Sequence, residues 1–452
     1  MPLHAPLPGP EEATDRRILR AMLGSSIPAQ TFSWQVARFA ESLIQDVPID
    51  CIEGQDYEAP LYYFLLRRAL GLGPERKPPC FVHLHSPTQV ICHFNDWDIG
   101  RADHLTAKRL EDYVIHAADA ALCPSRYLAR QVERHYGLGE GSVEQIPLPR
   151  GDTPFIERTA ATWASGTICY VGRMEPRKGV FEWIDAAVRM ARERPGLQFE
   201  LIGADTSPAN AWPGSVRAAL LDRVPRDLRS VISFVDAMPR QELRHRLARA
   251  RIAVVPSRWE NYPNTCVEAM ATGLPVLATP HGGMIEMVQD GLNGWVAADA
   301  SVDALAATLR CALEAAPERL AEMGQRAAAD IRRLCDNAST VERHQAFRAR
   351  VASMGAIRST KVPTQRSSTV LFGRGTDSPA IGHARADAGT GLSVLVEMAS
   401  PGEADDVIAD LRAQTQVPTA VVIDAPGFSE AEYQDVERRL AEARIPIASR
   451  HA

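Results

Sequence analysis

Short apolar runs alternate with helix-like segments through the middle of the chain. The apolar runs span residues 168–171, 199–202, 231–234, 252–255, 275–278 and 294–297. The helical segments between them span residues 180–194, 240–249, 265–272 and 284–289. Strands that alternate with helices at this spacing are typical of βαβ units, which build a parallel sheet. The pattern predicts a doubly wound α/β domain over about residues 161–325.

A weaker form of the same alternation precedes this domain. Strands are predicted at residues 49–52, 80–84, 120–123 and 143–146, and helices at residues 31–45, 60–70, 105–117 and 125–136. No apolar run with a glycine-rich turn stands before residue 31, and residues 17–23 have a helical pattern. We therefore expect a first α/β domain over residues 1–160 whose opening strand is either missing or not recognisable.

The last hundred residues change in character. Alanine-rich helices continue to about residue 354 and complete a second domain of residues 161–354. Residues 355–390 are rich in Ser, Thr, Gly, Pro and Arg, which is typical of a linker. In residues 391–452, apolar runs at 392–397 and 420–423 flank a predicted helix at 402–414, and a final helix is predicted at 430–444. This segment predicts a small α/β appendage.

Composition limits the class of protein. The 452 residues allow about three domains at roughly 150 residues each, and 45% apolar with 23% charged residues is ordinary for a soluble globular chain. The sequence offers no apolar stretch of about 18 residues and no signal-peptide pattern. A net charge of −6 gives no basic footprint for nucleic acid. The eight scattered cysteines form no CxxC pair, which favours a reducing compartment over a zinc or disulfide framework.

The segment 254–283 holds the densest candidate chemistry. A predicted buried strand ends at Pro256, Glu260 follows at its carboxyl end, and the next helix carries Glu268. Ligands bind at the carboxyl ends of strands in open α/β sheets, and two carboxylates there suit the vicinal diol of a ribose or a sugar. The N–H groups of Asn264 and Thr265, at the start of the helix, suit a phosphate.

Structural roles for the same residues remain open. Thr265 and Glu268 have the spacing of a capping box, in which the acid closes the first turn of its own helix. Glu260 considered alone is more often a solvated loop acid.

A second candidate segment, residues 170–179, joins a strand to a helix through a basic loop. Arg173 and Lys178 would lie beside a helix N-terminus, where both the cations and the helix dipole favour an anion. The Walker pattern is absent, and a solvated basic loop is the alternative. Only four of the 50 basic residues are lysines, so a lysine at position 178 suggests that a compact ammonium is required there.

Two histidines follow a predicted strand in the segment 80–87. An HxH pattern is typical of some metal-dependent hydrolases, but no further ligand set accompanies it here. His83 is expected to be buried structure, whereas His85 lies where the strand ends and could reach a cleft between domains.

Together these motifs resemble those of the retaining glycosyltransferases of family 4, which have the GT-B architecture of two facing Rossmann-like domains. Residues 171–179 resemble the basic loop of the family, and residues 260–268 resemble its E-x7-E motif. A Gly282–Gly283 pair and Glu286 follow, as in the family. Residues 118–128 resemble the segment before the crossing between the domains. The resemblance covers roughly residues 45–350, and it implies that the first domain is Rossmann-like and lies on the acceptor side.

The resemblance implies transfer of a hexose from a nucleotide-sugar donor to a glycan or lipid-linked acceptor, with retained anomeric configuration. Arg173 and Lys178 would neutralise the departing diphosphate, Glu260 would hold the transferred sugar, Glu268 the ribose, and His85 would contact the donor sugar. No metal or other cofactor is implied, because the two cations replace a metal. His85, Glu260, Arg173 and Lys178 are the expected catalytic residues. The expected donor site comprises Arg173, Lys178, Glu260, Asn264, Thr265 and Glu268.

Other outcomes stay open. Residues 391–452 resemble the opening of a family 2 glycosyltransferase of the GT-A type, shortened to a fragment. A catalytically impaired nucleotide-sugar-binding or scaffold protein is the alternative function. The expected organism is a bacterium, the expected product is a polysaccharide, and no nucleic-acid partner is expected. The expected location is the cytoplasm, with peripheral association at the inner face of the membrane as a further option.

Overall fold

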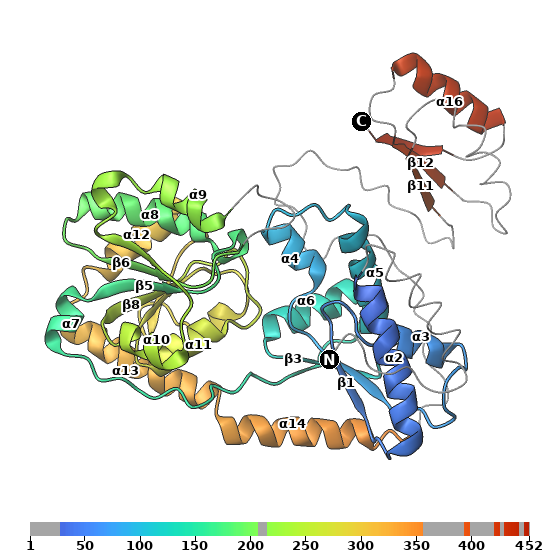
Figure 1. Ribbon diagram of the computed structural model, residues 1–452, viewed down its shortest axis with the longest axis horizontal. Coiled ribbons are helices and arrows are strands. Elements are labelled where there is room, and N and C mark those ends of the chain that lie inside the picture. Colours follow the sequence, from blue (N-terminus) through green and yellow to red (C-terminus); the bar gives the residue numbers. More distant parts are fainter. Residues whose placement is uncertain are drawn as a thin grey trace. The chain divides into compact units, whose positions relative to one another are not determined.

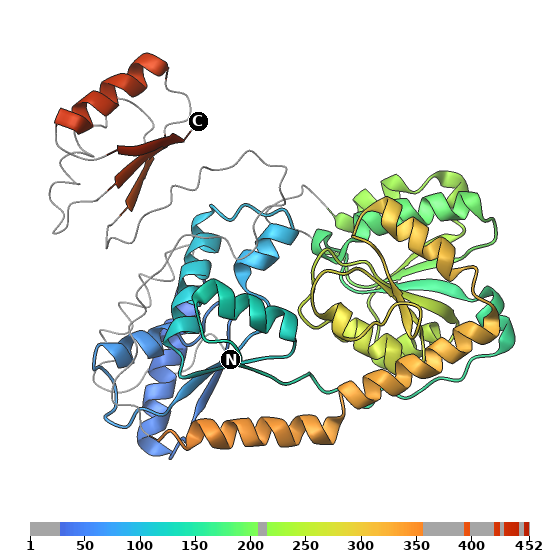
Figure 2. The same ribbon diagram turned by 180° about the vertical axis from the view of Figure 1, so that it is seen from behind.

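The computed structural model describes residues 28–206, 215–355, 393–397, 420–424, 429–442 and 447–451. The chain divides into two units, Met1–Gly373 and Arg374–Ala452. The helix expected at residues 17–23, the helix expected at 402–414 and nearly all of the expected linker lie outside the described residues. Figures 1 and 2 show two separate sheets within the first unit, each with its own helices.

The first sheet has four parallel strands in the order β1-β2-β3-β4. They are β1 (Ile52–Gln55), β2 (Cys80–His83), β3 (Ala120–Cys123) and β4 (Val143–Gln145). The last three match their predicted positions, but β1 starts where its predicted run ends, because this short strand alternates between half-buried and exposed residues and carries few apolar ones. The helices of this domain are α2 (Pro28–Asp46), α3 (Tyr62–Ala69), α4 (Thr88–Phe94), α5 (Ala102–Ala117) and α6 (Arg126–Tyr136).

Helices cover both faces of the first sheet. Alternation along β2 sends Val82 into a core with α2, α3 and α5, while Phe81 faces the opposite side. That opposite side is covered by α14 (Asn337–Ala352), whose Phe347 and Val351 lie four residues apart on one helix face. The rings of Phe81 and Phe347 meet edge to face with centroids 5.0 Å apart. Helix α14, which is predicted from the sequence to belong to the second domain of residues 161–354, thus packs against the first sheet (Figure 2).

The second sheet has six parallel strands in the order β10-β9-β8-β5-β6-β7. This is the doubly wound order of a Rossmann fold, which reverses between β5 and β8. The strands are β5 (Thr167–Val171), β6 (Phe199–Ile202), β7 (Ile232–Val235), β8 (Ala250–Val255), β9 (Val276–Ala278) and β10 (Gly294–Val296), all within two residues of their predicted positions.

Helices also cover both faces of this sheet (Figure 1). Trp183 and Leu305 belong to a core on the side of α8 and α12, and Met270 and Ile331 belong to one on the side of α11 and α13. The segment predicted as a helix at residues 284–289 is instead a short 3-10 turn, η3 (Gly283–Glu286). The helical segments are α7 (Ala160–Ser165), η1 (Pro176–Lys178), α8 (Val180–Glu193), α9 (Val216–Arg223), η2 (Arg226–Leu228), α10 (Arg240–Leu247), α11 (Asn264–Ala271), α12 (Val302–Ala312) and α13 (Pro317–Leu334).

The second unit holds a parallel sheet in the order β11-β12-β13. The strands are β11 (Ser393–Glu397), β12 (Ala420–Asp424) and β13 (Ile447–His451), and the accompanying helix is α16 (Glu430–Glu442). The first two strands and this helix lie where the sequence predicts them, whereas β13 was not predicted. Val436 and Leu440 of α16 are buried and lie four residues apart on one face. None of the helices in the described ranges is long and apolar enough to cross a bilayer.

Candidate functional site

The loop that carries Glu260 lies beyond the carboxyl end of β8, where a doubly wound sheet binds its ligands. The N–H of Glu260 donates to the carbonyl of His281 at 3.3 Å, and its own carbonyl accepts from the N–H of Gly283 at 2.9 Å. A Cβ at position 282 would lie 1.9 Å from the carbonyl oxygen of Glu260, and Gly282 has a φ of +107°. The glycine pair is therefore required for the two loops to meet.

Glu260 belongs to a buried cluster of four charges. Its carboxylate is bonded to Nζ of Lys178 and lies 3.2 Å from Nη1 of Arg177. Nη2 of Arg177 donates to Oε1 of Glu175 at 2.6 Å. Two cations and two carboxylates make the cluster neutral as a whole. The structure thus brings Lys178 and Glu260 together, as the assignment of both to one site predicts.

Burial and charge compete in setting the pKa values of this cluster. Burial pushes the pKa of Glu260 up, but the charges of Arg177 and Lys178 outweigh it, and the pKa lies below its usual range. Burial also lowers the pKa of Lys178, against the attraction of Glu260. We conclude that Glu260 is ionised at neutral pH, so the carboxylate is a hydrogen-bond acceptor for hydroxyl groups.

Arg173 lies at the exposed side of the same loop. Its side chain is 60% exposed and lies 3.5 Å from Glu175. With Arg173 included, three cations face two carboxylates, which leaves one positive charge in excess. The loop is held against the end of β8 by Gly179, which has a φ of +68° and whose Cβ would lie 1.9 Å from the carbonyl oxygen of Pro256. The arrangement offers an exposed cation beside a buried, balanced cluster.

Helix α11 presents the other predicted donor-binding residues. The helix begins at Asn264, its N-cap is Pro263 and no side chain caps it, so the capping-box interpretation of Thr265 and Glu268 is wrong. Glu268 instead lies 3.3 Å from Nη2 of the exposed Arg240, a pairing of little energetic weight. The carboxylate is left available for a ligand.

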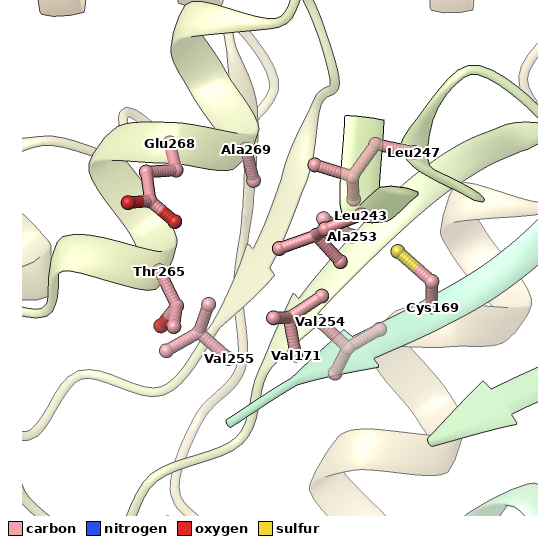
Figure 3. Close-up of a pocket in the computed structure, with 10 residues that line it drawn as sticks. All are labelled: Cys169, Val171, Leu243, Leu247, Ala253, Val254, Val255, Thr265, Glu268 and Ala269. Atoms are coloured by element: carbon pink, nitrogen blue, oxygen red, sulfur yellow. The ribbon is translucent and has the colours of Figure 1, made fainter. Parts of the chain in front are cut away.

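A small crevice opens beside these residues. Figure 3 shows Thr265 and Glu268 on one side of it, with apolar side chains of two strands and α10 on the other. The crevice is lined by Cys169, Val171, Leu243, Leu247, Ala253, Val254, Val255, Thr265, Glu268 and Ala269. The space holds about one water molecule, so it marks Thr265 and Glu268 as the polar rim beside the sheet and does not by itself enclose a ligand.

His85 lies two residues beyond the end of β2. Its imidazole stacks on that of His83 with centroids 4.3 Å apart. Burial, and secondarily the charge of His83, lowers the pKa of His85 to about 4, so the ring is neutral at pH 7. His83 is buried and its Nδ1 lies 3.2 Å from Oε1 of Glu53, which confirms the structural role expected for it. In the described part of the chain, no three His, Cys, Asp or Glu residues are placed to hold a metal.

Loops of the first domain bond directly to the Glu260 loop. Nδ2 of Asn261 donates to the carbonyl of His85 at 2.7 Å, and its Oδ1 accepts from the hydroxyl of Ser125. Arg258 bridges Glu182 of the second domain and Asp96 of the first, at 2.7 and 2.6 Å. These bonds place the His85 segment against the loop that holds Glu260.

Glu286 makes a further bond between the domains. Its carboxylate accepts from the N–H of Tyr127 at 2.8 Å and from the N–H of Arg126 at 3.2 Å. An acid is stabilising at a helix N-terminus, and here it comes from the second domain to α6 of the first.

The sequence did not identify Glu175, Arg177 and Asn261 as site residues. Arg177 stands next to Lys178 in the same basic loop, yet no pattern separates a buried arginine from a solvated one. Asn261 follows Glu260 directly, and its importance depends on contacts with residues 84, 85 and 125, which are far away in the sequence.

Two family models of glycosyltransferases match successive parts of the chain. Residues 3–149 match the family model "Glycosyltransferase Family 4", and residues 160–330 match "Glycosyl transferases group 1". A glycogen synthase of Mycobacterium tuberculosis is 30% identical over 226 residues, which cover 49% of this chain and 52% of that protein. The chain spans about half the length of the curated relatives it matches.

Two solved structures share the fold. Sucrose-phosphate synthase from Thermosynechococcus elongatus is 19% identical, with a TM-score of 0.57 over 72% of this chain and 79% of that one. HepE from Anabaena, solved in complex with UDP-glucose, is 18% identical, with a TM-score of 0.53 over 70% of this chain and 82% of that one. The expected GT-B fold of two Rossmann-like domains is confirmed.

Proposed function

We propose that this chain, which carries glycosyltransferase domains of the family 4 and group 1 types, moves a sugar from a nucleotide-sugar donor to an acceptor. The observation that carries the proposal is the bond between Lys178 and the buried Glu260 at the carboxyl edge of the second sheet, with Arg173 exposed beside it. The UDP-glucose bound by the structurally similar HepE supports a nucleotide-sugar as the donor.

In such a donor, the cations of the site would meet the diphosphate, and the Glu260 carboxylate would meet the sugar. Negative charge builds on the diphosphate as its bond to the sugar breaks, and preorganised cations stabilise that charge most strongly where water is excluded. The side chain of Lys178 is 15% exposed and that of Arg173 is 60% exposed, so one cation would hold the diphosphate inside the site while the other meets it at the entrance. A diphosphate that draws Lys178 away would leave Oε1 of Glu260 able to accept from a sugar hydroxyl, while Oε2 stays paired with Arg177.

The remaining donor contacts follow from α11 and the first domain. Glu268 and Thr265, at the crevice rim, would accept from the ribose hydroxyls, with the N–H groups at Asn264 and Thr265 near a phosphate. The neutral ring of His85 would contact the donor sugar as a hydrogen-bond partner without adding charge.

We further propose that transfer needs no metal or other cofactor, retains the anomeric configuration and delivers a hexose to a glycan or lipid-linked acceptor. The surplus cation of the basic loop supports the first point, since it supplies positive charge of the kind that a divalent ion would otherwise supply to the diphosphate. The proposed location is the cytoplasm, including the inner face of the membrane.

Residues 391–452 are proposed to be an appendage derived from the opening of a family 2 domain of the GT-A type. The parallel order β11-β12-β13 and the helix α16 support an α/β origin.

The test is release of nucleoside diphosphate from a panel of UDP-, GDP- and ADP-sugars, with and without glycan and lipid-linked acceptors. We expect release from at least one donor, unchanged by a chelator, and an anomeric proton coupling in the product that matches the donor. Donor binding in calorimetry without any release would support the alternative, a nucleotide-sugar-binding protein without catalysis. If the chain shows neither donor binding nor release of nucleoside diphosphate, both the proposed function and its alternative are contradicted.

A further inference from the structure

Both backbone groups of His85 are held by side chains, one from each domain. Its N–H donates to Oδ1 of Asp56 at 2.8 Å, and its carbonyl accepts from Nδ2 of Asn261 at 2.7 Å. Asp56 is fully buried at the end of β1, and Asn261 is 3% exposed in the second domain. These two bonds from buried side chains fix the backbone of His85 on both sides of its Cα and so set where its ring projects.

The side chain of Asn261 is bonded at both ends to the first domain. Its Nδ2 donates to the carbonyls of Leu84, at 3.2 Å, and of His85, and its Oδ1 accepts from Ser125. An amide is the side chain that can donate to two carbonyls and accept from a hydroxyl at the same time. The geometry therefore uses both donors of the amide and also its acceptor oxygen.

The backbone of Asn261 is continuous with that of Glu260, a member of the charge cluster. Asn261 follows Glu260 directly, and Gly283 Cα approaches so closely that an added Cβ would lie 2.0 Å from the carbonyl oxygen of Asn261. The backbone that carries Asn261 is thus fixed by the same glycine pair that fixes Glu260. Any shift of this backbone would move Glu260 and the bond to His85 together.

We propose that Asn261 is a positioning residue that fixes the His85 segment of the first domain relative to Glu260 of the second. The inference rests on the proposed function, since it assigns the two residues it joins to one reaction. Asn261 itself touches neither diphosphate nor sugar in this scheme. Its loss should therefore leave donor binding largely intact and slow the chemical step.

The test compares Asn261→Ala with Asn293→Ala. Asn293 is equally buried in the second domain, where its amide donates to Met287 and to Asp330, but it has no bond to the first domain. Hydrogen exchange of the peptide 84–92, followed by mass spectrometry, measures how firmly the His85 segment is held. Donor kcat and KM are measured on the same samples, and Asn261→Asp serves as a second variant because it keeps the shape while losing both donors.

We expect both Asn261 variants to exchange faster over residues 84–92 and to lose about 10²-fold in kcat, with donor KM changed less than threefold. Asn293→Ala should leave exchange over 84–92 and the kinetic constants unchanged. Unaltered exchange over 84–92 in Asn261→Asp overturns the proposal, whatever the activity. If the wild-type chain transfers no sugar, the proposed function fails, while the exchange experiment still decides whether Asn261 holds the segment.

Discussion

The buried pair between Lys178 and Glu260 makes a quantitative prediction about stability. In the wild-type cluster, the charges of Arg177 and Lys178 balance those of Glu175 and Glu260. Lys178→Met leaves a net charge of −1 in the cluster, and Glu260→Gln leaves +1. Removing one partner of a buried ion pair costs about 3–5 kcal/mol, because the remaining cluster is buried with an unbalanced charge.

The double variant restores neutrality, because Arg177 keeps its 2.6 Å bond to Glu175. Replacing a whole buried pair is often nearly neutral in free energy. We therefore expect Lys178→Met with Glu260→Gln to lose no more free energy of unfolding than either single variant. Independent effects would instead sum to about 6–10 kcal/mol.

The assay is urea unfolding at pH 7, followed by circular dichroism, on the wild type, both single variants and the double variant. Arg189→Met is the control, because Arg189 pairs with the exposed Asp303 and should cost less than about 1 kcal/mol. A double variant whose loss equals the sum of the single losses would refute the description of the cluster as one electrostatic unit.

Three further predictions concern the frame around the site. Gly282→Ala should lose more than about 1 kcal/mol in free energy of unfolding and should weaken donor turnover, because the added Cβ meets the carbonyl of Glu260. The control in a thermal unfolding comparison is Gly291→Ala, since Gly291 also has a positive φ but has open space around it. Burial raises the pKa of Glu111 to about 8, although hydrogen bonds from Thr88 lower it. The stability that the protonated carboxyl contributes to the folded state is therefore complete below about pH 4.5 and is lost as the pH rises to about 8. Glu111→Gln should flatten that decline in urea titrations, and an unchanged slope would contradict the assignment. Arg158 donates to backbone carbonyls at the ends of α10 and α11, so Arg158→Met should cost at least about 1.5 kcal/mol in urea unfolding, and no loss would show that these bonds carry little weight.

All six strands of the second domain could be predicted, whereas the short helices α7 and α9 were not. Its strands are buried on both faces and stand out as apolar runs, and the glycines at 179, 282 and 283 mark close approaches that side chains would block. The strand order could not be derived from these runs, since pairing depends on which crossovers pack. The resemblance to a known family implied two Rossmann-like domains, and the order itself came from the structure.

The first domain was harder to predict for a physical reason. The edge strand β1 has an alternating pattern with a glycine at its third position, and α4 starts directly after Pro87 without a capping side chain. Neither feature gives a strong local signal. The role of α14 depends on Phe347 and Val351 meeting a sheet more than 200 residues earlier in the chain, which no local pattern reveals.

Some residues of the candidate site could also be predicted from sequence motifs, whereas others could not. Arg173, Lys178, Glu260 and Glu268 follow from motif spacing, because the first three stand in strand-to-helix connections and Glu268 lies in the helix that follows Glu260. The capping-box alternative for Glu268 could be rejected only when the helix was seen to begin at Asn264. The roles of Arg177 and Asn261 depend on contacts within folded loops and between domains, so the structure was required to identify them.

The most direct test of the account is the rate at which Lys178→Ala releases nucleoside diphosphate from the donor that the wild type uses. The control is Lys108→Ala, which removes an ion-paired lysine of α5 that lies 2.6 Å from Asp112. If Lys178 stabilises the departing diphosphate, kcat should fall about 10²-fold in Lys178→Ala and stay near the wild-type value in Lys108→Ala. Equal rates in Lys178→Ala and the wild type would contradict the central claim.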